Sequence, residues 1–301
     1  MTTAAQTPRE QIRISRQWLD LLKELPQERG RIIVIGGIDS GKTTLCRWLL
    51  SKFPALARPA LVDSDIGQST VGPPGCVGWR FAGQTECQYT FTGDITPATN
   101  PTATLAGTCK AVRDAEAAGA GLVLIDTSGY LGGRGGFELK SAKLELLAPL
   151  QALILGDSPE IKCLLAGWYR DPRVTIHRIA QSEVLVQKTR VQRTQWRQER
   201  FAEALAGGNL RKVPLAGKEL SGLPTASELK TAGLEPSDLQ GLLLGFHDLQ
   251  RRGLCLGLLQ ALDLPNQEIL VRAPQVAEQA AGITFGVLKL TAEGQEIGRI
   301  T

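Results

Sequence analysis

The sequence contains few of the residues that build transition-metal sites. Among its 301 residues are two histidines, His177 and His247, and six cysteines that form no CxxC pair. Because structural zinc sites are made of Cys and His ligands at short spacings, we expect no zinc site. The cysteines are instead predicted to be reduced thiols that pack inside a cytosolic protein.

Long apolar runs are also missing. The opening stretch, MTTAAQTPREQIRISRQ, lacks the apolar segment of a secretory signal. No stretch approaches the roughly 18 apolar residues that indicate a membrane helix. We therefore expect a cytoplasmic protein with no membrane partner. The net charge of +4 is too small to predict nucleic-acid binding by itself, so any basic surface must be local.

Strand-like and helix-like segments alternate between residues 31 and 206. A continuous apolar run, typical of a strand buried on both faces, lies at 31–36. Buried strands that end in aspartate are predicted at 59–63 and 121–126, and two further strands at 151–157 and 173–179. Helical stretches lie between or after them, at 42–53, 101–118, 138–148 and 189–206. This alternation predicts an α/β fold of the P-loop NTPase class, with a mostly parallel, doubly wound sheet flanked by helices.

The length of the chain predicts about two domains. We assign residues 1–206 to a P-loop domain, in which 1–26 form an N-terminal helix and 187–206 form an arginine-bearing lid helix. From 207 onward turns and short strands dominate, so residues 207–301 are predicted to form a small β-rich C-terminal domain. A Gly/Pro-rich excursion over 66–100 is predicted to contain a hairpin, and a loop of this length usually has a function.

The segment GGIDSGKT, residues 36–43, fits the P-loop (Walker A) pattern and stands between a predicted strand and a predicted helix. Backbone N–H groups of such a loop converge on phosphate, aided by the positive end of the helix. Lys42 is expected to bridge the β- and γ-phosphates of ATP, and the Thr43 hydroxyl to be a ligand of Mg²⁺. The predicted nucleotide-binding residues are Gly36, Gly37, Asp39, Ser40, Gly41, Lys42, Thr43 and Thr44.

Two carboxylates, Asp63 and Asp65, stand at the end of the second predicted strand in the segment DSDIGQST. Ligands of open α/β sheets bind outside the carboxyl ends of the strands, so both side chains are expected to face the nucleotide. One of them can hold Mg²⁺ and the other can accept a proton from an incoming hydroxyl. The spacing alone also fits a polar loop without a chemical role.

The segment DTSGYLGGRGG follows the third buried strand and begins with a D-x-x-G pattern, Asp126 to Gly129. A GTPase uses this pattern to sense a γ-phosphate, which favours a switch protein. The same residues fit a glycine-rich rim that closes over a substrate, with Tyr130 as a stacking surface.

A basic run, KTRVQRTQWRQERF, occupies residues 188–201. Arg193 and Arg197 are four residues apart and therefore lie on one face of the predicted helix. Two guanidiniums in that arrangement can clamp a transferring phosphoryl group. A basic run is also typical of a solvated helix face.

Taken in order, these segments resemble the polynucleotide 5′-hydroxyl kinases, a family that includes the RNA-kinase subunit of the pre-mRNA 3′-end cleavage machinery and nucleolar kinases of pre-rRNA processing. The resemblance covers roughly residues 30–301, and DxDxGQ after the P-loop is its most specific part. The matching pieces are GGIDSGKTT, DSDIGQS, FTGDITPATNP, DTSGYLGG, RTQWRQERF and the closing GITFGVLKL…GQEIGRI.

The resemblance implies a role for each matching residue. Asp65 is implied to be the general base toward the 5′-hydroxyl, and Asp63 to support the metal. Arg193 and Arg197 are implied to be lid arginines that close on the phosphates. The residues implied to lie near the terminal nucleotide are Gln68, Thr96, Asn100 and Tyr130. Tyr130 stands where some members of the family carry Trp, which puts the strength of base stacking in question.

Three functions are compatible with the sequence. The first is an ATP-dependent kinase that phosphorylates 5′-hydroxyl ends of RNA or DNA. The second is a GTPase or ATPase switch that uses Asp126 and Gly129 as its γ-phosphate sensor. Against a GTPase, no N-K-x-D segment is present to select guanine. The third is an adaptor that binds ATP without turnover; protein partners are not predicted.

Overall fold

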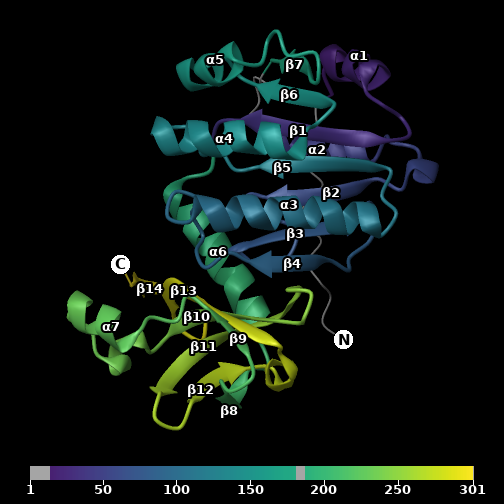
Figure 1. The fold of residues 1–301 in the computed structure, drawn as a ribbon. Helices are drawn as coiled ribbons and strands as arrows, with labels where there is room; N and C mark the ends of the chain where they lie inside the picture. The colour runs from purple at the N-terminus through teal and green to yellow at the C-terminus, as the bar shows by residue number, and fades with distance from the viewer. Residues whose placement is uncertain (1–13, 181–186, 301) are drawn as a thin grey trace.

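The computed structural model describes residues 14–180 and 187–300. Two sheets dominate these residues, one above the other in Figure 1. Sheet A has seven strands in the order β4-β3-β2-β5-β1-β6-β7. Sheet B is also seven-stranded, with the order β14-β13-β10-β11-β12-β8 and β9 paired to β13. None of the helices in the two described ranges is long and apolar enough to cross a membrane.

Sheet A confirms the expected mostly parallel, doubly wound architecture. Its parallel strands are β1 (Gly30–Gly36), β2 (Ala60–Ser64), β5 (Leu122–Thr127), β6 (Gln151–Leu155) and β7 (Thr175–Ile179). The predicted hairpin is also present, as β3 (Cys76–Phe81) and β4 (Gln88–Phe91). Because β3 pairs antiparallel with β2, the hairpin extends the main sheet and does not stand apart as a separate element.

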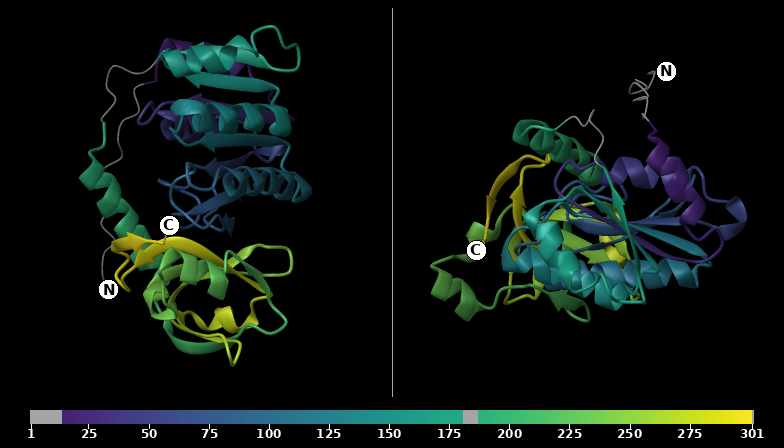
Figure 2. Two further views of the ribbon diagram at one scale, coloured as in Figure 1. Left: turned by 60° about the vertical axis from the view of Figure 1, so that its left-hand side comes forward. Right: turned by 90° about the horizontal axis from the view of Figure 1, so that it is seen from above.

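Helices cover both faces of sheet A (Figures 1 and 2). On one face lie α1 (Arg16–Glu24), α2 (Lys42–Leu50) and the short η1 (Ala55–Ala57). On the other lie α3 (Pro101–Ala117), α4 (Gly133–Leu147) and α5 (Pro159–Ala166). Alternate residues of β1 divide between the two cores, since Ile33 and Ile35 face α3 and α4 whereas Ile32 and Val34 face α2.

Two helix boundaries differ clearly from the sequence-based expectation, and one helix was not predicted. The N-terminal helix, predicted over 1–26, covers Arg16–Glu24, and its first 13 residues lie outside the described part. Helix α4 begins at Gly133, inside the predicted glycine-rich loop, because Gly136 lets the first turn pack against the backbone of Leu131. Helix α5 was not predicted, although Ser158 followed by a proline is a recognisable helix start.

The C-terminal part is rich in strands, as predicted. Its strands are β8 (Asn209–Pro214), β9 (Glu219–Ser221), β10 (Leu242–His247), β11 (Gly253–Asp263), β12 (Glu268–Ala273), β13 (Gly282–Leu290) and β14 (Glu296–Arg299). It also contains elements that were not predicted: α7 (Ala226–Ala232), η2 (Pro236–Leu239) and η3 (Gln275–Gln279).

Helix α6 (Arg190–Leu205) joins the two sheets and runs beside both of them in Figure 2. Phe201 and Leu205, near its C-terminal end, are buried in one apolar cluster with Phe91 of β4 and Leu256 and Leu258 of β11. Burial of such side chains contributes about 2 kcal/mol each. The helix predicted to be a lid is therefore anchored between the sheets at its C-terminal end, and Arg193 lies near its other end.

Candidate active site

The P-loop follows β1 at the carboxyl edge of sheet A. The chain leaves β1 toward β2 on one side and later returns to β6 on the other, so the loop lies at the switch point of the sheet. A Cβ at residue 36 would lie 2.5 Å from the Ser40 hydroxyl, which explains the glycine there. Gly41 adopts φ +90° and begins α2 without a side-chain cap, so the first N–H groups of that helix remain available to an anion.

Lys42 is buried and folds back over the loop. Its Nζ donates to the Gly37 carbonyl at 2.6 Å and lies 3.4 Å from the Ser40 hydroxyl. The loop therefore concentrates positive charge and backbone donors in one place, as phosphate binding requires.

Asp63 and Asp126 are neighbours across two parallel strands, because their Cα positions are register partners in β2 and β5. The Thr43 hydroxyl donates to Asp126 Oδ2 at 2.6 Å, whereas the buried Oδ1 of Asp126 has no hydrogen-bond partner among the described residues. A buried carboxylate oxygen beside a P-loop threonine fits the ligand shell of Mg²⁺. Asp126 is thus the carboxylate adjacent to the expected metal ligand Thr43.

The carboxylate of Asp63 has a different role in the loop that follows β2. Its Oδ1 accepts from the Asp65 N–H at 3.0 Å, and its Oδ2 accepts from the Thr70 N–H at 2.6 Å and the Thr70 hydroxyl at 2.9 Å. These bonds close the segment 63–70 into a fixed loop. Both oxygens of Asp63, the expected metal-supporting residue, therefore accept hydrogen bonds within this loop, and the buried oxygen without a described partner belongs to Asp126.

Burial makes both of these carboxylates hard to ionise. Burial and the neighbouring charges of Asp126 and Asp65 raise the pKa of Asp63 to about 7. Burial likewise raises the pKa of Asp126 to about 6, against the opposing bond from Thr43. A cation beside them would favour the charged forms, which is the environment a divalent metal supplies.

Asp65 differs from its two neighbours in being half-buried. Its backbone N–H is held by Asp63, and no donor within residues 14–180 and 187–300 contacts its carboxylate. An unoccupied, partly accessible carboxylate at this edge of the sheet has the property required of a proton acceptor.

Two fully buried lysines on α4 complete the charged cluster, and the sequence reasoning missed them. Lys140 Nζ donates to the Ser128 carbonyl at 2.6 Å, and Lys143 Nζ donates to the Ser64 hydroxyl at 2.7 Å. Burial lowers the pKa of Lys140 well below its ordinary value and that of Lys143 to about 8. The signal was present in the sequence: both lysines lie three residues apart within a predicted helix, where the neighbouring Leu139 and Leu144 are core residues.

Arg193 of the lid helix lies over the P-loop. Its Nη1 donates to Asp39 Oδ2 at 2.9 Å, and the Lys188 N–H donates to the same oxygen at 3.0 Å. Asp39 has φ +52°, a left-handed conformation that turns the loop at this point. Gln68 also reaches the lid, with Nε2 3.5 Å from the Arg193 carbonyl, while its buried Oε1 has no partner among the described residues.

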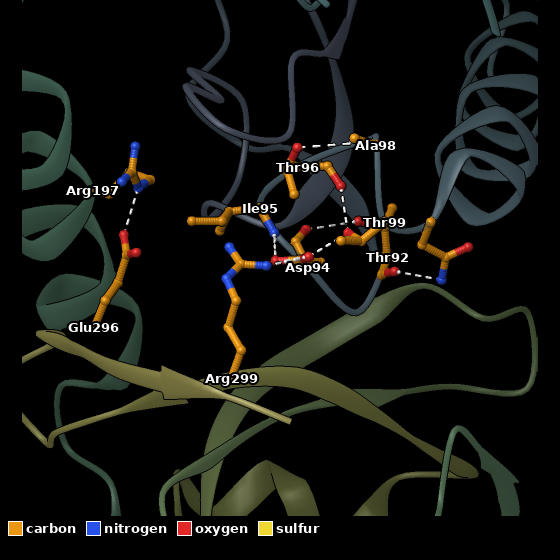
Figure 3. Close-up of polar contacts among 10 residues, drawn as sticks. Thr92, Asp94, Ile95, Thr96, Ala98, Thr99, Arg197, Glu296 and Arg299 are labelled. Carbon is orange, nitrogen blue, oxygen red and sulfur yellow. Dashed lines mark hydrogen bonds and ion pairs between the residues drawn. The ribbon is translucent and has the colours of Figure 1, made fainter. Parts of the chain in front are cut away.

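Arg197 is paired with strand β14 of sheet B (Figure 3). Its Nε donates to Glu296 Oε1 of β14 at 2.7 Å, and its Nη2 lies 3.2 Å from the Thr194 hydroxyl. The two predicted lid arginines are therefore separated by their partners: Arg193 is held by the P-loop and Arg197 by the C-terminal sheet.

The loop that follows β4 is held by a residue of the same strand, β14 (Figure 3). Asp94 is buried, forms an ion pair with Arg299, accepts from the Thr99 hydroxyl, and accepts from the Ile95 N–H at 2.6 Å. The sequence reasoning did not identify Asp94. Its position between a glycine and a Thr/Pro-rich turn, in a segment that resembles the family, could have indicated that Asp94 has a structural role.

Thr96 and Asn100, expected near the terminal nucleotide, lie in this loop. Asn100 begins α3 as its N-cap: Oδ1 accepts from the Ala103 N–H at 3.0 Å and Nδ2 donates to the Thr92 carbonyl at 3.3 Å. Thr96 is half-buried, and its hydroxyl is 3.4 Å from the Ala98 N–H. Both side chains are therefore used in shaping the loop.

Residues 129 and 130 border the P-loop. A Cβ on Gly129 would lie 2.6 Å from the backbone of Ile38, so glycine is required for close packing between the two loops. This contact gives the glycine of the D-x-x-G pattern a packing role. Tyr130 is half-buried, and its hydroxyl lies against Gly135 in the first turn of α4.

The strand order of sheet A, the P-loop at its switch point and the carboxylates beside it define a P-loop nucleotide-binding protein. The chain belongs to the family described as the mRNA cleavage and polyadenylation factor CLP1 P-loop, whose sequence model matches residues 36–207.

Similar proteins cover most of the chain. A polyribonucleotide 5′-hydroxyl-kinase of Pyrococcus abyssi is 25% identical over 89% of this chain and 90% of its own length. A protein of the same name from Methanocaldococcus jannaschii is 23% identical over 89% of each chain. The solved complex of Clp1p with Pcf11p contains a chain of the same fold, with a TM-score of 0.66 and 13% identity over 90% of this chain and 78% of that one.

Proposed function

We propose that this protein transfers the γ-phosphate of ATP to the 5′-hydroxyl end of a polynucleotide, RNA or DNA. The observation that carries the proposal is the meeting of a P-loop, a carboxylate free to accept a proton and a lid arginine at one edge of sheet A. The relatives from Pyrococcus abyssi and Methanocaldococcus jannaschii bear the name of this activity. A cytoplasmic role in RNA processing is part of the same proposal.

In the proposed reaction the 5′-hydroxyl oxygen forms a bond to the γ-phosphorus as the bond to the β-phosphate oxygen breaks, leaving ADP. Asp65 accepts the hydroxyl proton. Lys42 and Arg193 compensate the negative charge on the transferring group, so positioning and electrostatics provide most of the rate. Arg197 joins them when its bond to Glu296 is exchanged for one to phosphate.

Thr43 and Asp126 are the residues that would hold Mg²⁺, and the unpartnered Oδ1 of Asp126 supports this assignment. The ion would neutralise charge between the β- and γ-phosphates. We propose that Asp63, expected to support the metal, instead fixes the loop that presents Asp65.

Four residues are proposed to serve the terminal nucleotide in two ways. Gln68, with a buried unpartnered oxygen, and Tyr130, with a half-exposed ring, are proposed to contact it directly. Thr96 and Asn100 are proposed to shape the loop beside it. The boundary between residues 206 and 207 is likewise proposed as the division between a kinase domain and a domain that positions the lid.

The test supplies γ-labelled ATP and matched 5′-hydroxyl RNA and DNA oligonucleotides to the purified protein. We expect label transfer by the wild type, loss of transfer in Lys42→Ala and Asp65→Asn, and normal transfer in the exposed control Asp20→Asn. Transfer that survives Asp65→Asn removes the proposed base. Retention of ATP without turnover by the wild type would favour the adaptor, and preferential GTP hydrolysis without label transfer would favour the switch.

A further inference from the structure

Two cavities adjoin beside β3 on the face of sheet A that α2 covers. The larger, of about 720 Å³, lies between the end of α2, η1 and the β3–β4 turn. The smaller, of about 410 Å³, lies between α6 and the β3–β4 hairpin. Both are lined by Arg80 and Thr85, so the two cavities meet at these residues, and together they are called the groove.

Arginines dominate the charge of the larger cavity. Arg47, Arg58 and Arg80 line it, and no Asp or Glu does. None of the three is in an ion pair with a described residue: Arg58 lies 4.6 Å over the ring of Phe81, and Arg80 donates to the Gln84 carbonyl at 3.0 Å. Unpaired cations lining a concave surface raise the local concentration of anions.

The smaller cavity leads toward the candidate active site. Thr70, which fixes the Asp63 carboxylate, lines one end of it. Arg200 of the lid helix lines it as well and donates to the Gly72 carbonyl at 3.0 Å. The acid on its wall, Glu203, is already paired with Arg200 at 2.6 Å.

We infer that this groove binds the sugar–phosphate backbone of the acceptor strand beyond its 5′-terminal nucleotide. The inference rests on the proposed function, because it assigns the acceptor as a single-stranded polynucleotide and not a lone nucleoside. Arg80 and Arg47 neutralise phosphates of the strand, and Tyr89 and Phe81 add apolar surface to the walls of the two cavities. Since the charged contacts are to phosphate, the groove accepts strands without sequence preference.

The test compares short and long acceptors in two variants of the groove. Arg47 is exposed and has no partner among the described residues, and Arg80 bonds only a backbone carbonyl there, so Arg47→Glu and Arg80→Gln are expected to fold normally. Arg58 is left unchanged because it supports the ring of Phe81 and lies against Gly119. The matched control is Arg113→Glu, an exposed arginine on α3, which covers the opposite face of sheet A.

We expect KM for a long 5′-hydroxyl oligonucleotide to rise about tenfold in Arg47→Glu, which corresponds to about 1.4 kcal/mol. In the same variant, KM for a 5′-hydroxyl dinucleotide and KM for ATP stay unchanged. In Arg113→Glu, KM for the long strand, for the dinucleotide and for ATP all stay unchanged. The salt dependence of long-strand binding falls by about 0.7 in log–log slope for each arginine removed. Arg47→Lys, which keeps the charge, restores most of the affinity.

Equal KM changes for the dinucleotide and the long strand would overturn the inference, as would no change for either. Fluorescence anisotropy with a labelled 5′-phosphorylated strand keeps the test independent of turnover. If the wild type transfers no phosphate but the groove variants bind the labelled strand more weakly, the proposed kinase function is wrong and the groove is still a strand-binding site. If polyglutamate displaces the strand as well as a nucleic acid of equal charge does, the groove is a general polyanion site and the inference fails.

Discussion

Replacing the buried Lys143 with methionine is expected to stabilise the protein while removing a charge from the active site. The side chain is fully buried, and burial lowers its pKa from 10.5 to about 8. That difference of 2.5 corresponds to about 3 kcal/mol at 1.36 kcal/mol for each pKa unit. Loss of the 2.7 Å bond to the Ser64 hydroxyl subtracts about 1 kcal/mol, which leaves a gain of about 2 kcal/mol at pH 7.

The sign of the pH dependence follows from the lowered pKa. Below pH 8 both the folded and the unfolded chain hold the Lys143 proton, so the cost of burying the charge is present in full. Between pH 8 and 10.5 the unfolded chain binds the proton more tightly than the folded chain does, so wild-type stability rises with pH. The advantage of Lys143→Met is therefore about 2 kcal/mol at pH 7 and close to zero near pH 10.

Urea unfolding at both pH values, with Lys52→Met as the control, measures this difference. Lys52 is exposed, and its replacement is expected to change stability by less than about 0.5 kcal/mol at either pH. A gain for Lys143→Met that is the same at both pH values would refute the electrostatic reasoning and indicate simple packing. We also expect the variant to lose kinase activity, because Asp65 and Asp126 lose a neighbouring positive charge.

Three further predictions concern the candidate site. Asp126→Asn is expected to lower kcat by about 100-fold and to raise the Mg²⁺ concentration at half-maximal activity, since the free oxygen beside Thr43 loses its charge; steady-state kinetics at varied Mg²⁺ measure both. Glu296→Gln is expected to lower KM for ATP about fivefold, because Arg197 is released from an ion pair that is worth about 1 kcal/mol; initial rates at varied ATP measure it. Gly129→Ala is expected to weaken ATP binding more than about tenfold in calorimetry, since a Cβ 2.6 Å from the P-loop backbone must displace it.

Two of these variants have a control near them in the chain. Glu293 lies in the turn just before β14 and has no ion-pair partner among the described residues, so an equal drop in KM in Glu293→Gln would contradict the reasoning. Gly132→Ala adds a Cβ that meets nothing within 4 Å, and we expect ATP affinity to be unchanged. For Asp126→Asn, an unaltered Mg²⁺ requirement would remove Asp126 from the metal site.

The fold was predictable because buried strands and P-loop spacing are local signals. Each segment that the sequence marked as a strand is present in sheet A, and the central strands β2 and β5 are buried along their whole length, which explains their largely apolar sequences. The sequence did not reveal how the hairpin joins the sheet. Pairing of β3 with β2 is a contact between segments separated by a loop, and no local pattern reports it.

The candidate site was predictable where one segment forms it and obscure where distant segments meet. The P-loop is contiguous, so its residues were identified together. Asp126 was considered as a γ-phosphate sensor, and its place beside Thr43 follows from the pairing of β1 with β5. The partners of Arg197 and Asp94 lie in β14, about 100 and 200 residues farther along the chain, so neither ion pair is visible from sequence spacing.

The buried charges at the nucleotide edge act against stability in the absence of a ligand. Burial raises the pKa of Asp63 and of Asp126, with Asp126 adding to the effect on Asp63, and burial lowers the pKa of Lys140 and of Lys143, so neither sign of charge is fully compensated by the protein itself. A phosphate group bound at the P-loop would bring negative charge to Lys42, and a divalent ion bound beside Asp126 would bring positive charge to the carboxylates. Each ligand would therefore compensate one sign of charge in the cluster. Because each ligand relieves the repulsion that remains around the other, nucleotide and metal are expected to bind more tightly together than separately. The same electrostatics that make the buried charges costly therefore favour binding of nucleotide and metal as one complex.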